Sequence, residues 1–352
     1  MNADADDIET ARHSAWAYLD AGNHRRAREV LGTALALAPD DPVLLVLNAF
    51  AALGLRDYIG AERSAWSALK LAPASADGVR AYALALRGQR RLVEAEWWAW
   101  RAAYGSPDDY LTRMAYAEVL ADIGRLREAE LEVNEAIRLQ SSDPDLFVLR
   151  GNIFRRQNRI AESDADIREA LRLRPDHAVA THNLAVNRLS RGRLSEALRG
   201  FLGAGGLDPS VAPLARRNIA VVVTKMLRRC TWMAMLVIWG AVQLGIDADA
   251  GRSTIFWRVF VGVSALALGG AVGLFVRSVP IRTLGALLKA EPILLLRSVL
   301  ILIAVAGGVV CAVSGVAGSA VSGAVTGALF KIGPPLLLFG AIALLLGHYT
   351  RR

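Results

Sequence analysis

Cysteine, histidine and lysine are all scarce in this sequence. The 352 residues include two cysteines, Cys230 and Cys311, both at or within apolar runs. Two cysteines exclude the dense disulfide framework of small secreted domains, so we expect reduced, buried thiols. Alanine, arginine, glycine and valine are abundant while lysine is rare, which is typical of bacteria with GC-rich genomes.

The sequence also lacks the common catalytic and metal-binding motifs. It contains no H-E-x-x-H, P-loop, G-x-S-x-G or C-x-x-C pattern. No two histidines have metal-ligand spacing together with a carboxylate; the five are His13, His24, His177, His182 and His348. We therefore predict a protein that is not an enzyme and that binds no metal or cofactor.

Acidic residues are almost missing from residues 212–352. This part has 3 Asp+Glu against 14 Lys+Arg, whereas residues 1–211 have 30 against 27. The net charges of +11 and −3 predict two domains. The basic residues lie at the ends of apolar runs, as in membrane segments, so we predict no nucleic-acid binding. Residues 1–7 are acidic and unlike a signal or transit peptide, so we expect a frayed tail.

A 34-residue repeat runs from about residue 8 to residue 211. Small residues recur at this spacing without a slip at Ala27, Ala61, Ala95, Ala129, Ser163 and Ala197, and again at Ala34, Ala68, Ala102, Ala136, Ala170 and Ala204. Within a unit the two positions are seven apart and share one face of a helix. A polar or glycine-bearing turn precedes this helix, and a proline ends most units. Each unit is therefore predicted to be a pair of helices that stacks on its neighbours.

The unit length, the alanines and the closing proline resemble the tetratricopeptide repeat. This resemblance implies an all-α chain with six repeats over residues 8–211. It also implies a right-handed superhelix whose concave groove binds a protein partner.

The C-terminal part is predicted to be a four-helix transmembrane bundle. About 20 apolar residues cross a bilayer, and we expect spans at about 230–246, 255–276, 293–313 and 332–349, after a capping helix at 212–229. Residues 314–330 are consistent with a loop, a re-entrant helix or a fifth span. Residues 281–291 have the pattern of a short amphipathic helix at the interface. Arg258 and Arg297 are close to span ends and are expected to snorkel towards water.

The basic residues near the span ends predict the topology. Nine lie on the side shared by both termini and three on the other side. The positive-inside rule then places both termini and the repeats in the cytoplasm, with the chain in a bacterial inner membrane. No acidic residue falls at mid-span, which argues against transport by this chain alone.

The groove is the predicted binding site. Asn152, Asn183 and Arg217 resemble the clamp with which some tetratricopeptide proteins hold a terminal carboxylate, although Val148 and Pro213 replace two of its lysines. More broadly, these residues together with Arg155, Arg156 and Arg188 are expected to form a basic floor for an acidic or extended peptide.

Tryptophans on the second helices have two interpretations. Trp66 and Trp100 occupy equivalent positions in adjacent repeats, and Trp98 lies beside them in sequence. They either pack between repeats or form a surface patch for a partner.

The repeats and the apolar C-terminal part together predict a membrane-anchored adaptor. The alternative is a regulatory or accessory subunit of a membrane transporter or channel.

Overall fold

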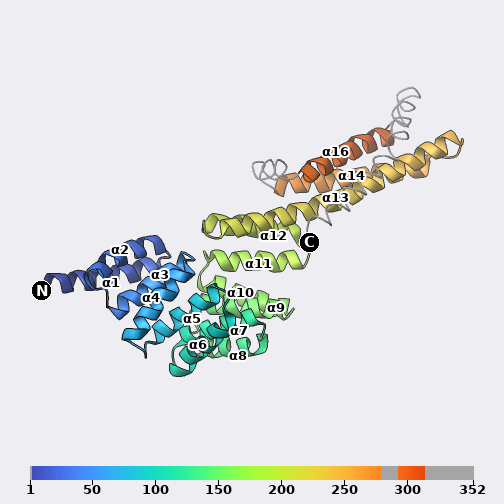
Figure 1. Ribbon diagram of the computed structural model, residues 1–352. Helices are drawn as coiled ribbons and strands as arrows, with labels where there is room; N and C mark the ends of the chain where they lie inside the picture. Colours follow the sequence, from blue (N-terminus) through green and yellow to red (C-terminus); the bar gives the residue numbers. More distant parts are fainter. Residues whose placement is uncertain (1, 279–291, 314–352) are drawn as a thin grey trace. The chain divides into compact units, whose positions relative to one another are not determined.

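The computed structural model describes residues 2–278 and 292–313, and its regular structure there is entirely α-helical (Figure 1). The chain divides into two compact units, Met1–Ala180 and Thr181–Arg352. The first contains α1 (Asn2–Asp20), α2 (His24–Leu37), α3 (Pro42–Gly54), α4 (Tyr58–Leu71), α5 (Ala76–Gly88), α6 (Leu92–Gly105), α7 (Tyr110–Ile123), α8 (Leu126–Leu139), α9 (Pro144–Arg156) and α10 (Ile160–Leu173). The division falls within α11 (Ala178–Ser190), and the second continues with α12 (Leu194–Leu207), α13 (Ala212–Asp249), α14 (Ile255–Ser278) and α16 (Pro292–Val313).

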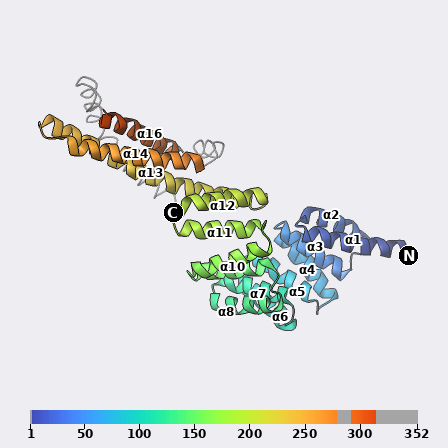
Figure 2. The same cartoon turned by 180° about the vertical axis from the view of Figure 1, so that it is seen from behind.

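The first unit is a row of helical hairpins, which can be followed from both sides in Figures 1 and 2. The repeat alanines of this unit lie on the inner face of each second helix and are buried, as the 34-residue register predicts. A methyl group lets the first helix of the hairpin approach closely. Ala95 and Ala99 of α6 thus share one core with Ala83 and Leu86 of α5, the first helix of the same hairpin.

Each hairpin turn contains one residue with a left-handed backbone. These residues are 34 apart: Gly22, Arg56, Arg90, Gly124, Asn158 and Gly192, with φ between 60° and 91°. Such a φ is unfavourable for a side chain with a Cβ and routine for glycine. The turn geometry is therefore kept in all six repeats, even where the sequence does not supply glycine.

Short polar side chains start several of the first helices. The side chains of Asp41, Ser75, Asp109 and Asp143 accept backbone N–H groups at the N-termini of α3, α5, α7 and α9. The first helix differs from the expectation, because α1 begins at Asn2 and includes the residues expected to form an acidic tail.

Arginines at the starts of second helices link successive repeats. Arg91 Nη1 lies 2.7 Å from Glu62 of the preceding repeat, and Arg159 Nη1 lies 2.8 Å from Glu130. Arg125 pairs with Glu96 in the same way. Burial opposes ionisation of Glu62, but hydrogen bonds from Gln89 and Arg91 outweigh it and lower the pKa of this carboxyl.

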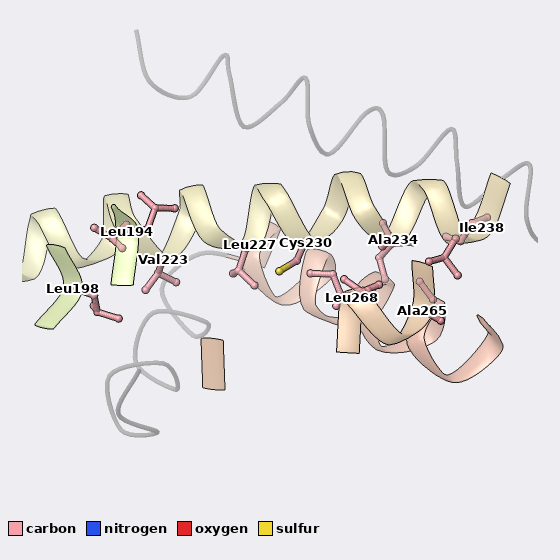
Figure 3. Close-up of a cluster of buried hydrophobic side chains, with 14 of the residues drawn as sticks. Leu194, Leu198, Val223, Leu227, Cys230, Ala234, Ile238, Ala265 and Leu268 are labelled. Atoms are coloured by element: carbon pink, nitrogen blue, oxygen red, sulfur yellow. The ribbon is translucent and has the colours of Figure 1, made fainter. Parts of the chain in front are cut away.

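The second unit is organised around α13, a continuous helix of 38 residues. Its first half packs on α12 and its second half on α14 and α16, within one buried cluster. Figure 3 shows this cluster, including Leu194, Leu198, Val223, Leu227, Cys230, Ala234, Ile238, Ala265 and Leu268. A Cβ at Gly308 would lie 2.7 Å from the Cβ of Ala265, so glycine is needed where α16 meets α14. The predicted burial of the Cys230 thiol is confirmed.

Two described helices, Ala212–Ala248 and Ile255–Leu274, are long and apolar enough to cross a membrane. The third predicted span lies in α16, whose apolar part Arg297–Val310 is shorter. The predicted span at 332–349, the segment 314–330 and the interfacial helix at 281–291 fall outside the described residues. One expectation was wrong, because Arg297 is buried rather than snorkelling. It shares a helix face with Leu300, Ile301 and Ala304, which pack into the cluster.

Candidate peptide-binding groove

First helices of the first unit line a pocket of about 390 Å³. Most of its residues come from α7 and α9, with Arg87 from α5 and Val179 from the start of α11. Apolar side chains from α7 and α9, including Met114, Val148 and Leu149, form part of its wall. Because these helices repeat side by side, the pocket collects residues from equivalent positions in successive repeats.

A second pocket, of about 430 Å³, is lined by α3, α4, α5 and α7 and shares residues with the first. The shared residues are Arg87, Glu118 and Asp122, which form an ion cluster. Arg87 Nη1 lies 2.5 Å from Glu118 and Arg87 Nε lies 2.8 Å from Asp122. The charge of Arg87 is thus satisfied within the chain, and the two pockets form neighbouring parts of one groove.

Arg155 and Arg156 differ from Arg87, because neither has a carboxylate within 4 Å among the described residues. Arg155 donates to the Asn152 amide oxygen at 3.3 Å, and Arg156 donates to the Ala121 carbonyl at 2.5 Å. The Nε atom of Arg155 is buried without a hydrogen-bond partner in the described structure. Burial lowers the pKa of Arg155, and the positive charge of Arg156 adds to that effect. The two guanidinium groups are therefore a local excess of positive charge.

The far end of the pocket carries a histidine–carboxylate pair. His177 Nε2 lies 2.9 Å from the Asp145 carboxylate, and the His177 ring is buried while Asp145 is about half exposed. The hydrogen bond from His177 lowers the pKa of Asp145, although burial opposes the shift. This pair joins the start of α9 to the turn before α11 within the first unit.

The first pocket is not basic throughout, and the predicted basic floor stays a prediction. Three arginines line the first pocket, but so do Glu118, Asp122 and Asp145, and their formal charges cancel. The missed carboxylates were present in the 34-residue register, since Glu118 and Asp122 stand one repeat before Asn152 and Arg156. The positive character is confined to the α9 end of the pocket.

The other predicted groove residues lie in the second unit. Asn183 is buried, Arg217 is exposed on α13, and Arg188 Nε lies 3.5 Å from Glu196. The predicted clamp of Asn152, Asn183 and Arg217 stays a prediction.

The predicted tryptophan patch divides into two aromatic groups. Trp98 is half-buried and contacts Trp66 and Tyr82, with ring centroids 6.2 and 4.9 Å away. Trp100 instead contacts Tyr104 at 5.6 Å. Trp98 thus packs between repeats, while Trp66 and Trp100 remain exposed.

Comparison with known proteins supports the repeat assignment. Residues 148–210 match the tetratricopeptide repeat family. No curated protein matched the chain. Human IFIT1, solved as a dimer with PPP-AAAA, is similar with a TM-score of 0.55 and 15% identity over 96% of this chain and 72% of that one. The APC/C hetero-tetramer Cut9–Hcn1 gives 0.52 and 13% over 80% and 52%.

A tetratricopeptide protein from Thermus thermophilus is also similar, with a TM-score of 0.48 and 19% identity over 52% of this chain and 99% of that one. At such identities a likeness to solved structures concerns the fold alone. The family match over residues 148–210 and the 34-residue hairpins together support tetratricopeptide-type repeats in the described part of the chain, where the regular structure is all-helical.

Proposed function

We propose that the chain is a membrane-anchored scaffold whose groove binds an acidic segment of a partner protein. Tetratricopeptide repeats are typical of protein-interaction scaffolds rather than of enzymes. A stacked row of hairpins is formed before the partner arrives, so binding costs little ordering of the groove. The pocket on α5, α7 and α9 is the site that we assign to the partner.

The arginine pair in this pocket is the observation that carries the proposal. A half-buried guanidinium without an acceptor at Nε is unfavourable, and a carboxylate brought by a partner would satisfy it. Arg156 stands beside Arg155 and would strengthen the attraction. The apolar wall near Val148 and Leu149 suits the aliphatic part of an extended segment.

Membrane anchorage is supported by the outward faces of the second unit. On α14, Val259, Val263 and Leu266 are 61–73% exposed, and on α16 Leu302 is 62% exposed. A soluble helical bundle places polar residues there, whereas hydrocarbon favours apolar ones.

The length of α13 also fits a bilayer. From Arg229 to Asp247 the helix rises about 27 Å, close to the roughly 30 Å of a hydrocarbon core. At its far end Asp247 accepts the indole N–H of Trp257 at 2.8 Å, and tryptophan favours the interface. We therefore propose an inner-membrane location with the repeats in the cytoplasm.

The groove is tested with the full chain in nanodiscs and an array of acidic peptides, each paired with its amide analogue. In the double variant Arg155→Ala/Arg156→Ala, peptides that bind the wild type should lose about tenfold or more in affinity, because a charge-assisted hydrogen bond contributes roughly 1.5–3 kcal/mol. The control Arg168→Ala/Arg172→Ala removes two exposed arginines from α10. Equal binding of acidic and amide peptides, or equal loss in both variants, would refute the groove assignment.

Anchorage is tested on membranes from cells that produce the chain. The chain should resist alkaline extraction, and a protease should remove residues 1–211 only after the membrane is opened. Release at alkaline pH would contradict anchorage, and cleavage in intact cells would contradict the topology.

A further inference from the structure

The outward faces of three consecutive second helices carry equivalent exposed positions, which we call the strip. In each helix it consists of positions i, i+4, i+7 and i+11, which share one face. The strip comprises Ile59, Arg63, Trp66 and Lys70 on α4, Val93, Trp97, Trp100 and Tyr104 on α6, and Arg127, Leu131, Asn134 and Arg138 on α8, and all twelve residues are exposed.

The strip is far more apolar than an ordinary solvent face. Val93 is 84% exposed, Leu131 68%, Ile59 65% and Tyr104 56%. Single exposed apolar residues are normal, but contiguous ones mark interaction surfaces. The same four positions on α10 are Ala161, Ala165, Arg168 and Arg172. Large exposed apolar side chains are therefore a feature of α4, α6 and α8 and are not required by the repeat fold.

The charges of the strip are of one sign. None of its twelve residues is acidic, and Arg63, Lys70 and Arg127 form no ion pair within the described part of the chain. Arg101, next to the strip on α6, lies over the rings of Trp97 and Trp98 at 5.7 and 5.0 Å. A second copy of the strip would bring these positive charges together, so the charges disfavour self-pairing and favour an anionic partner.

Indole rings, aliphatic side chains and basic residues on one helical face are the composition that settles at a lipid interface. The apolar side chains enter the headgroup boundary, and the basic side chains interact with anionic headgroups. We propose that the strip on α4, α6 and α8 lies on the surface of an anionic bilayer. This inference rests on the proposed anchorage, which keeps a bilayer within reach, but not on the groove.

The test uses the full chain, with Cys230 and Cys311 replaced by alanine, reconstituted in nanodiscs of neutral or partly anionic lipid. A polarity-sensitive fluorophore is attached to Trp97→Cys. The matched control carries it at Ala165→Cys, the equivalent exposed position two repeats later. A bilayer contact predicts a blue shift and quenching by spin-labelled lipid at position 97 in anionic discs only. The same probe is then read in a Trp97→Cys chain that also contains Arg63→Gln, Lys70→Gln and Arg127→Gln. Its equilibrium constant for binding the bilayer surface should fall on the order of fivefold for each charge removed.

A second measurement needs no substitution. Lys70 is the single lysine in residues 1–211, and its labelling by a water-soluble amine reagent should be slower in anionic than in neutral discs. High salt should remove the difference. A water-exposed probe and equal Lys70 labelling in both discs would overturn the inference, as would shielding that depends on protein concentration and not on lipid. A chain that fails to enter discs at all would refute the anchorage instead.

Discussion

At the scale of single residues, the hairpin turns show how strongly the fold imposes backbone geometry. The left-handed position is glycine in three repeats but arginine at 56 and 90 and asparagine at 158. The repeats with arginine accept an unfavourable conformation, and the rest of the hairpin must compensate. At this position, replacing glycine with another residue should destabilise the hairpin, and replacing arginine with glycine should stabilise it.

Replacing Gly124 with alanine should destabilise the α7–α8 hairpin by about 1 kcal/mol, because its φ is 91° and a Cβ is strained there. Hydrogen exchange of the α7 and α8 amides measures this local opening. Gly105→Ala serves as the control, since its φ is not left-handed and a Cβ meets open space. Equal exchange in the two variants would contradict the turn geometry.

The Asp145–His177 pair predicts a pH dependence. The pKa of Asp145 is lowered in the folded chain, so its stabilising effect is present above the pKa of the unfolded carboxyl and is lost as pH falls through the folded value. We expect His177→Ala to cost about 1 kcal/mol at neutral pH, allowing for the half-exposed carboxylate, and less in acid. The free energy of unfolding of the region around α9 and α10, measured for both chains at several pH values, tests this. A deficit that grows on acidification would contradict the sign.

At the scale of helices, the packed alanines set the spacing within each hairpin. Ala129 is fully buried in α8, within a core that also includes Ala95 and Val133. Ala129→Leu should overpack the hairpin and cost about 1–3 kcal/mol, seen as faster amide exchange in α7 and α8. Ala165→Leu on the exposed face of α10 should stay within roughly 0.5 kcal/mol. A neutral Ala129→Leu variant would argue against the repeat register.

At the scale of the whole chain, the repeats were predictable because their signal is local and recurs. Each buried alanine lies at a fixed distance from the next, so the sequence alone gives helix pairs. The groove chemistry was harder, because Arg87 meets Glu118 and Asp122 only once repeats stack. Counting arginines on one helix, such as Arg155 and Arg156, could not show the carboxylates contributed by the repeat before.

The burial of Arg297 was missed for a related reason. Its position near the end of an apolar run suggested snorkelling, but which side of α16 faces its neighbours depends on packing that no single helix reveals. The N-terminal boundary of α1 was also missed, because the acidic residues that we expected to form a frayed tail are part of the helix.

The unbroken path of α13 makes rotational phase a property that can be tested. One residue inserted after Lys225 would turn the rest of α13, with α14 and α16, by about 100° relative to α12 and would break the contacts between α12 and α14. Hydrogen exchange in α12 should then become faster than in the unmodified chain, and unchanged exchange would contradict this packing. The orientation of α14 and α16 relative to α12 is therefore set by the helical phase of α13.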